Sequence, residues 1–330
     1  TKLGLKLTNA TASTTVSDLS EITLWDGSTQ VGSLVISTGT TGTSTITNFT
    51  IPKGQSKSLT VKTVLTSIGT DLPARQGTLM AVDLIGAGNA QGTGQASGVT
   101  ITSSSAATTF SGVRVFKTFP TVDRLASGSS GIDSALNGTT DETVMGFSIK
   151  ADSTGKMSLY KFTFNVATTG VTADSLNVYA YNSYSSGTFS SPVSGIGSGG
   201  KFLNTDVDLE TKWAAASTDL EVYPQTTAAA STTVDIAAGA TMYFKVVATI
   251  TGVGSGDSLT TTLKGDSAYP SLATLMANYV NVEAAATASN NFIWSPRATT
   301  TTTSINDNDW INGYNVPTLP SGGITFSKSK

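Results

Sequence analysis

Two clusters of acidic side chains have the chemistry that a calcium ion prefers. In the stretch NTDVDLE, Asp206, Asp208 and Glu210 alternate, so on a β-strand their carboxylates would share one face. In the stretch INDNDW, Asp307 and Asp309 lie among asparagines. Since Ca²⁺ takes carboxylate and carbonyl oxygens as ligands, each cluster is a candidate calcium site. The alternative for each is a solvated polar face or turn, and no other cofactor is expected.

Aromatic side chains form a second kind of candidate site. Tyr179 and Tyr181 share one face of a predicted strand, and Tyr184 follows closely. An exposed aromatic row can stack on sugar rings or bury against a neighbouring subunit. The alternative is packing beneath the residues that follow this strand. Near the end of the chain, Trp310 and Tyr314 are candidate anchors, either for a partner surface or for the tail on its own domain.

Three asparagines, Asn9, Asn48 and Asn137, begin triplets that fit the N-glycosylation pattern. The pattern is weak evidence in a threonine-rich chain, where such triplets arise by chance. A lysine–asparagine cross-link is not expected, because the alternation of apolar residues turns both Lys6 and Lys161 outward.

The sequence contains few of the residue combinations that catalytic sites use. The chain has no histidine and no cysteine, which excludes a Ser-His-Asp or Cys-His site. Paired carboxylates could serve a glycosidase, yet nothing in the sequence selects a pair. No glycine-rich phosphate loop precedes a helix. We therefore expect a protein that is not an enzyme.

The composition favours an ordered β protein. Threonine and serine outnumber charged residues by more than two to one, and charged residues make up only 12% of the chain. Valine, threonine, isoleucine and aromatic residues stand in short alternating runs, as they do in strands. A net charge of −3 gives no electrostatic basis for binding nucleic acid. No apolar run approaches the roughly 20 residues of a membrane span.

One stretch is repeated, and the rest of the chain can be arranged around its two copies. The stretch at residues 46–65 recurs without a gap at an offset of 185 residues, so that residues 233–250 match residues 48–65 and Val246 matches Val61. Each copy is an alternating strand, a turn with glycine and a second alternating strand, which predicts a β-hairpin. A hairpin cannot bury its apolar face alone, so each copy implies a sandwich of two sheets.

The predicted fold class is all-β, with two tandem Ig-like β-sandwich domains and an extended C-terminal tail. The expected segments are a first domain at 1–118, a linker at 119–141, a larger second domain at 142–298 with an insertion at 181–232, and a tail at 299–330.

The first domain lacks a strand that the second domain has. Phe147 and Ile149 lie on one face of a strand that opens the second domain, whereas the first domain starts directly at the strand containing Leu3, Leu5 and Leu7. A sandwich without its opening strand has an unpaired edge and a groove in its core. We therefore expect these three leucines to line an acceptor groove.

The last residues of the chain could fill such a groove in a neighbouring subunit. The predicted donor strand, residues 323–328, contains Gly323, Ile324, Thr325, Phe326, Ser327 and Lys328. Its two apolar residues alternate after a glycine as Phe147 and Ile149 do. Head-to-tail donation of this strand would propagate a filament. One alternative is that upstream residues have been removed and the tail folds back on its own domain. Another is that the tail completes the first domain of the same chain.

The pattern resembles the Ig-like β-sandwich repeats of secreted bacterial surface proteins. The phrases LWDGSTQVGS, TIPKGQSKSLTVK and NNFIWSPRATTTTT resemble surface proteins of the small-genome candidate-phyla bacteria. The resemblance covers most of the chain and implies a secreted protein in an extracellular or cell-surface location. It supplies no catalytic residues.

Two functions follow as expectations. The first is a structural subunit of a filament or surface layer, whose partners are identical subunits joined by donor-strand exchange. The second is an adhesin or carbohydrate-binding module that uses exposed aromatic residues on glycans or other surface proteins.

Overall fold

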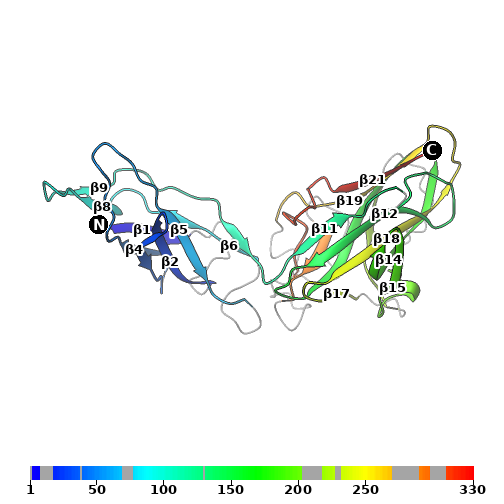
Figure 1. Ribbon diagram of the computed structural model, residues 1–330, viewed down its shortest axis with the longest axis horizontal. Helices are drawn as coiled ribbons and strands as arrows, with labels where there is room; N and C mark the ends of the chain where they lie inside the picture. Colours follow the sequence, from blue (N-terminus) through cyan, green and yellow to red (C-terminus); the bar gives the residue numbers. More distant parts are fainter. Residues whose placement is uncertain are drawn as a thin grey trace. The chain divides into compact units, whose positions relative to one another are not determined.

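The computed structural model describes residues 2–7, 18–37, 39–68, 77–128, 131–202, 218–226, 232–269, 290–297 and 310–330. The chain forms two compact units, Thr1–Phe116 and Lys117–Lys330, and each is built from β-strands (Figure 1). Within the described residues, no helix is long and apolar enough to cross a lipid bilayer. The predicted all-β fold is confirmed, and both units are sandwiches.

The first unit consists of two sheets and a separate strand pair. One sheet contains β1 (Lys2–Leu7), β4 (Thr41–Thr45), β7 (Val82–Leu84), β8 (Ala90–Thr93) and β9 (Thr100–Thr102). The other contains β2 (Leu19–Asp26), β3 (Thr29–Leu34) and β5 (Thr60–Leu65). The pair is β6 (Thr78–Met80) with β10 (Val113–Val115).

Alternating leucines hold the first unit together. Leu5 and Leu7 of β1 are buried while Lys6 between them is exposed, as the period of two in a strand requires. They pack in one cluster with Ile22 and Leu24 of β2, which belongs to the other sheet. The core of the first unit therefore lies between its two sheets.

The second unit is a larger sandwich. Its first sheet has the order β11 (Pro120–Arg124), β12 (Glu142–Ala151), β18 (Thr241–Thr251), β14 (Thr172–Ser185) and β15 (Thr188–Pro192). Its second sheet runs β16 (Thr218–Val222), β13 (Met157–Thr169), β19 (Ser258–Leu263) and β21 (Ile324–Ser329), with β17 (Val234–Ile236) and β20 (Phe292–Ser295) also paired to β13. A short 3₁₀ helix, η2, spans Ser198–Gly200.

Phenylalanines fill the space between the two sheets of the second unit. Phe147 on β12 stacks on Phe244 of its neighbour β18, with ring centroids 4.8 Å apart. It also meets Phe162 of the facing sheet edge-on at 5.5 Å. All three side chains are fully buried. These contacts across the interior identify a face-to-face sandwich.

The two units repeat the same strand registers. In the first unit Leu24 lies opposite Val61, and in the second Val178 lies opposite Val246. A second matched pair of registers joins Leu5 to Leu84 and Phe164 to Leu263. The 185-residue offset therefore relates β5 to β18, and an offset of 159 relates β1 to β13.

The segment expected to be a linker is partly a strand. Residues 120–124 form β11, which pairs antiparallel with β12 and buries Val122 completely. The second unit therefore begins at Lys117. Proline and neighbouring turn residues hid this strand, because a five-residue edge strand shows little alternation.

The expected insertion at 181–232 also contains sheet strands. β14 continues to Ser185, β15 forms a hairpin with it, and β16 pairs with β13. The described part of this segment widens both sheets of the second unit.

The C-terminal tail folds on its own unit, where residues 324–328 of the predicted donor strand form part of β21. β21 pairs antiparallel with β19 of the same chain, and Phe326 is 1% exposed. Trp310 packs with Tyr160 and Tyr223 on the outer face of the sheet. The tail alternative in which it folds back on its own domain is the one that the structure shows.

A buried carboxylate fastens the start of this tail. Asp266 is 2% exposed and accepts hydrogen bonds from the backbone amides of Asn291, Phe292 and Gly313. Burial raises the pKa of Asp266, although these hydrogen bonds act in the opposite direction. Trp294 and Ile311 exchange two backbone hydrogen bonds beside it. The tail is therefore joined to the second unit by several polar contacts.

Candidate strand-acceptor groove

The edge of β5 is the main structural difference between the two units. In the second unit β18 lies between β14 and β12, so both of its edges are paired. In the first unit the equivalent strand β5 pairs with β2 on one side, and no described strand pairs with its other side. An open edge carries backbone N–H and C=O groups that are available to another strand.

Equivalent residues differ sharply in exposure because of this missing neighbour. Ile250 of β18 is 1% exposed, whereas Leu65, its counterpart in β5, is 43% exposed. Lys328 of β21 is 2% exposed, whereas Val113, which holds the matching place in β10, is 70% exposed. In the second unit the Ile250 amide donates to the carbonyl of Thr139, just before β12, and Lys328 contacts Glu142 and Thr143 of β12.

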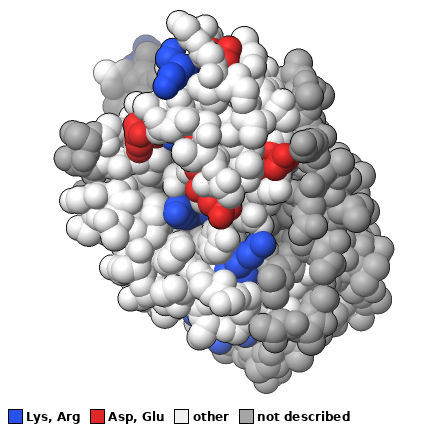
Figure 2. Space-filling model, turned by 90° about the vertical axis from the view of Figure 1, so that its right-hand side faces the viewer, with Lys and Arg blue, Asp and Glu red and all other residues white. Residues whose placement is uncertain are grey.

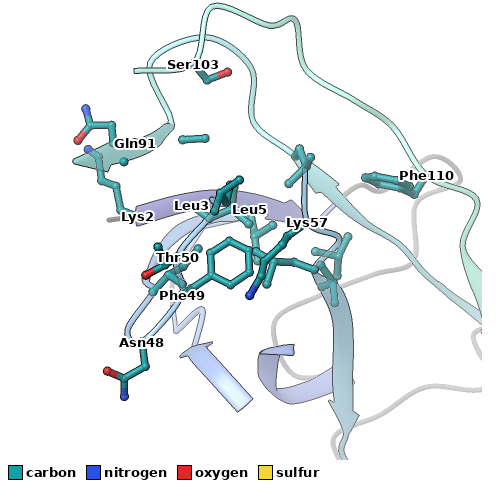
Figure 3. A pocket seen from close by; sticks show the side chains of 18 of the residues that line it. Lys2, Leu3, Leu5, Asn48, Phe49, Thr50, Lys57, Gln91, Ser103 and Phe110 are labelled. Carbon is teal, nitrogen blue, oxygen red and sulfur yellow. The ribbon is translucent and has the colours of Figure 1, made fainter. Parts of the chain in front are cut away.

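An apolar groove of about 1730 Å³ lies beside β5 in the first unit (Figure 3). One wall is the inward face of β5, and the opposite wall comes from β6, β7 and β10. The apolar residues along these walls include Leu59, Val61, Leu65, Met80, Val82, Leu84, Val113 and Val115. The groove occupies the place that β12 fills in the second unit.

Two of the three predicted acceptor leucines line this groove. Leu3 and Leu5 reach it from β1, and Figure 3 labels both together with Phe49 among the side chains that line the groove. Leu7 is 2% exposed in the core and does not line it. The other residues that line the groove were not predicted from the sequence. One of them, Phe110, is 52% exposed and lies in a loop that shows no alternation of apolar and polar residues.

The groove has positively charged groups and no acidic side chain among its described lining residues. Lys2, Lys53 and Lys57 all contribute to it. The Lys57 amino group lies 2.7 Å from a carboxylate oxygen of Asp26 and 5.2 Å from the centre of the Phe49 ring. Among the described residues, Lys2 and Lys53 form no ion pair.

The tyrosines of the predicted aromatic row pack against neighbouring rings and are not fully exposed to solvent. Tyr184 lies between Phe189 at 4.8 Å and Tyr243 at 5.7 Å, and Tyr181 contacts Phe189 at 5.3 Å. Burial raises the pKa of Tyr179, as it does that of Tyr181. All of these rings are only partly exposed. The structure therefore brings Tyr181 and Tyr184 together but offers no open aromatic platform there.

The candidate glycosylation sites fall in different settings. Asn48 is exposed and is one of the residues that line the groove (Figure 3). Asn137 is exposed, and its amide nitrogen donates to Asp133 and to the Ala135 carbonyl. Asn9 lies outside the described residues.

Both candidate calcium clusters, Asp206, Asp208 and Glu210 with Asp307 and Asp309, lie outside the described residues. The part of the chain that is described holds no group of three acidic, histidine or cysteine side chains able to bind a metal ion. Figure 2 shows one face of the molecule, on which the described charges of both signs are few and scattered.

The second unit contains two buried ion pairs that were not predicted from the sequence. Lys328 reaches Glu142 at 2.9 Å, with side chains 2% and 4% exposed. Lys161, expected to point outward, is fully buried and lies 2.8 Å from Glu221. Burial acts to raise the pKa of Glu142, but hydrogen bonds from Lys328 and from backbone amides outweigh it and hold that pKa below its ordinary value.

The chain was compared with known families, curated proteins and solved structures. No family model and no curated protein matches the chain. Among solved structures, a chain titled BspA_C_WT has 11% sequence identity, with 79% of each chain covered and a TM-score of 0.21. A similarity at this level carries no conclusion about function.

Proposed function

We propose that this chain is a structural subunit of an extracellular filament or surface layer, and that its first unit is completed by a β-strand from a neighbouring subunit. The observation that carries the proposal is the unpaired edge of β5 above an apolar groove of about 1730 Å³. The extracellular location is supported by the resemblance to secreted Ig-like repeats.

A strand is the occupant that this groove favours over a small ligand. A bound strand would pair with the backbone of β5, and each ladder hydrogen bond contributes about 0.5–1.5 kcal/mol. Apolar side chains on its inner face would cover Val61 and Leu65 and would contribute about 1.5–3 kcal/mol each. In the second unit β12 makes both kinds of contact with β18.

The donor we propose is not β21. Withdrawing β21 from its own unit would expose Phe326 and would leave Glu142 buried without Lys328. Breaking a buried ion pair in this way typically costs about 3–5 kcal/mol. Donor-strand exchange therefore remains the proposed mode of assembly, with a different segment as the donor.

A fusion can test the proposal by filling the groove within one chain. Because Leu5 corresponds to Phe164 in the strand registers, residues 142–159 placed ahead of Thr1 would put a copy of β12 before β1. We expect the fused strand to slow hydrogen exchange of the β5 amides. We also expect the fusion to form no filaments under the electron microscope, where the unmodified chain should form them.

The control is the same fusion with Phe147→Asp and Ile149→Asp in the added copy, which cannot enter an apolar groove. It should exchange and assemble like the unmodified chain. Filaments formed equally well by the filled fusion, or β5 amides that remain unprotected in it, would overturn the proposal.

A further inference from the structure

The properties of the donor strand for the first unit can be inferred from β12, which occupies the equivalent place in the second unit. This step rests on the proposed function, and it concerns the direction, register and charge of the donor. β12 runs antiparallel to β18, with Phe147 opposite Phe244 and Met145 opposite Val246. The 185-residue offset converts these two partners to Leu59 and Val61. A donor in the same place runs antiparallel to β5 and sets apolar residues against them.

The C-terminal end of such a donor reaches the basic end of the groove. In the second unit, the turn before β18 donates the Gly239 amide to the carbonyl of Asp152, just after β12. The equivalent turn of the first unit contains Lys53 next to Gly54, and Lys57 follows it. Opposite charge on the donor is favoured here.

The N-terminal end of the donor meets an apolar surface instead. In the second unit β12 begins with Glu142, which pairs with Lys328 of β21. The register of β10 on β6 places Val113 where β21 places Lys328, because Met80 corresponds to Leu259. Val113 is 70% exposed, so an apolar residue at the start of the donor would cover it.

We propose that the groove takes an extended segment of another polypeptide, antiparallel to β5, that is apolar at its N-terminal end and acidic at its C-terminal end. The required charge is a second reason, in addition to its burial, why β21 is not the donor. Lys328 near the end of β21 and Lys330 just after it would lie against Lys53 and Lys57. The donor therefore differs in charge from β12, which has Glu142 first and Lys150 near its end.

Peptides derived from the sequence of residues 142–153 test the charge order with the full 330-residue chain. An acidic peptide carries Glu142→Val and Lys150→Glu, and a basic peptide carries Glu142→Val and Asp152→Lys. Fluorescence anisotropy should give a Kd for the acidic peptide about threefold lower, a ratio typical of exposed ion pairs, and high salt should reduce the difference. The β21 peptide ITFSKSK should bind more weakly than either.

Charge reversal in the protein supplies the matched control. Lys53→Glu should reverse the preference between the two peptides. Lys6→Glu makes the same change of net charge on an exposed residue that does not line the groove, and it should leave the preference unchanged. The chain has no cysteine of its own, so single cysteines can report direction. A cysteine at the C-terminus of the peptide should form a disulfide with Gln55→Cys and not with Ser67→Cys.

The outcomes separate this inference from the proposed function. Tighter binding of the acidic peptide and cross-linking at position 55 support the inference. Equal or better binding of the basic peptide, or cross-linking at position 67, would overturn the inference and leave a strand-acceptor groove. Preferred binding of the β21 peptide would identify β21 of a second copy as the donor and would also overturn the inference. Failure of every peptide to bind would overturn both.

Discussion

Lys328 and Glu142 join the last strand of the chain to the second strand of the same unit through a buried ion pair of 2.9 Å. The Lys328 amino group also donates to the carbonyl of Thr143. The Glu142 carboxylate accepts backbone amides of Asn137, Gly138 and Thr139. Each charge therefore has several partners, which is the condition under which a buried pair is tolerated.

Replacing Lys328 with methionine should destabilise the second unit by about 3–5 kcal/mol, because Glu142 would remain buried without its cation. The double variant Lys328→Met with Glu142→Gln should recover part of this loss. Urea unfolding can be followed by tryptophan fluorescence in a Trp25→Phe background, which removes the tryptophan of the first unit. Lys150→Met, an exposed change on β12, should stay within about 0.5 kcal/mol of the parent. A cost of that size for Lys328→Met would contradict the role of the pair.

Stability of the second unit should fall as the solution becomes acidic. The folded pKa of Glu142 is lowered, so its contribution is fully present above the unfolded value of about 4.3 and is lost as the pH falls through the folded value. Unfolding free energies measured between neutral pH and pH of about 3 should therefore decrease, and Glu142→Gln should decrease less steeply. An identical slope in the two proteins would show that Glu142 does not control this dependence.

Asp266→Ala should loosen the tail, because three buried backbone amides would lose their acceptor. The cost of one buried unsatisfied group is about 1–3 kcal/mol. Limited proteolysis should then cut within residues 310–320 sooner than in the parent chain. Asp123→Ala removes an exposed carboxylate from β11 and should leave the cleavage rate unchanged. Equal cleavage in the two variants would argue against this anchor.

Val113→Ser should weaken donor binding without harming the fold. Val113 is 70% exposed, so its loss should change the unfolding free energy of the isolated chain by less than about 0.5 kcal/mol. Binding of the acidic peptide should weaken about fivefold, since the valine would be buried only in the complex. Val99→Ser removes a comparably exposed valine that does not line the groove, and it should leave the Kd unchanged. Equal effects on binding would place the donor elsewhere.

The sequence was sufficient to predict the duplicated sandwich. Alternation of apolar residues is a local signal, and the match of Val61 to Val246 carried the register of both hairpins. The position of β21 could not be predicted in the same way. Ile324 and Phe326 would suit many grooves, and the contact that selects one is made by Lys328 with Glu142, which lies far away in the sequence.

Lys161 illustrates a second limit of alternation. Its position in β13 does place it on the outer face of the sheet, as expected. That face is itself covered, because Trp310 of the tail packs there with Tyr160 and Tyr223. A pattern within one strand shows which face is apolar, but it does not show which later segment will cover the other face.

The open edge of β5 also has a consequence for timing. Of the large apolar residues that are conspicuously exposed, Val35, Ile51, Val64, Leu65, Val99, Ile101, Phe110 and Val113 belong to the first unit. If a donor covers the groove, the first unit gains much of its stability only at the moment of binding, since a ligand of the folded state stabilises it by mass action. Folding of this unit and joining of the subunits would then be a single event, and a subunit without a neighbour would remain the form most readily degraded.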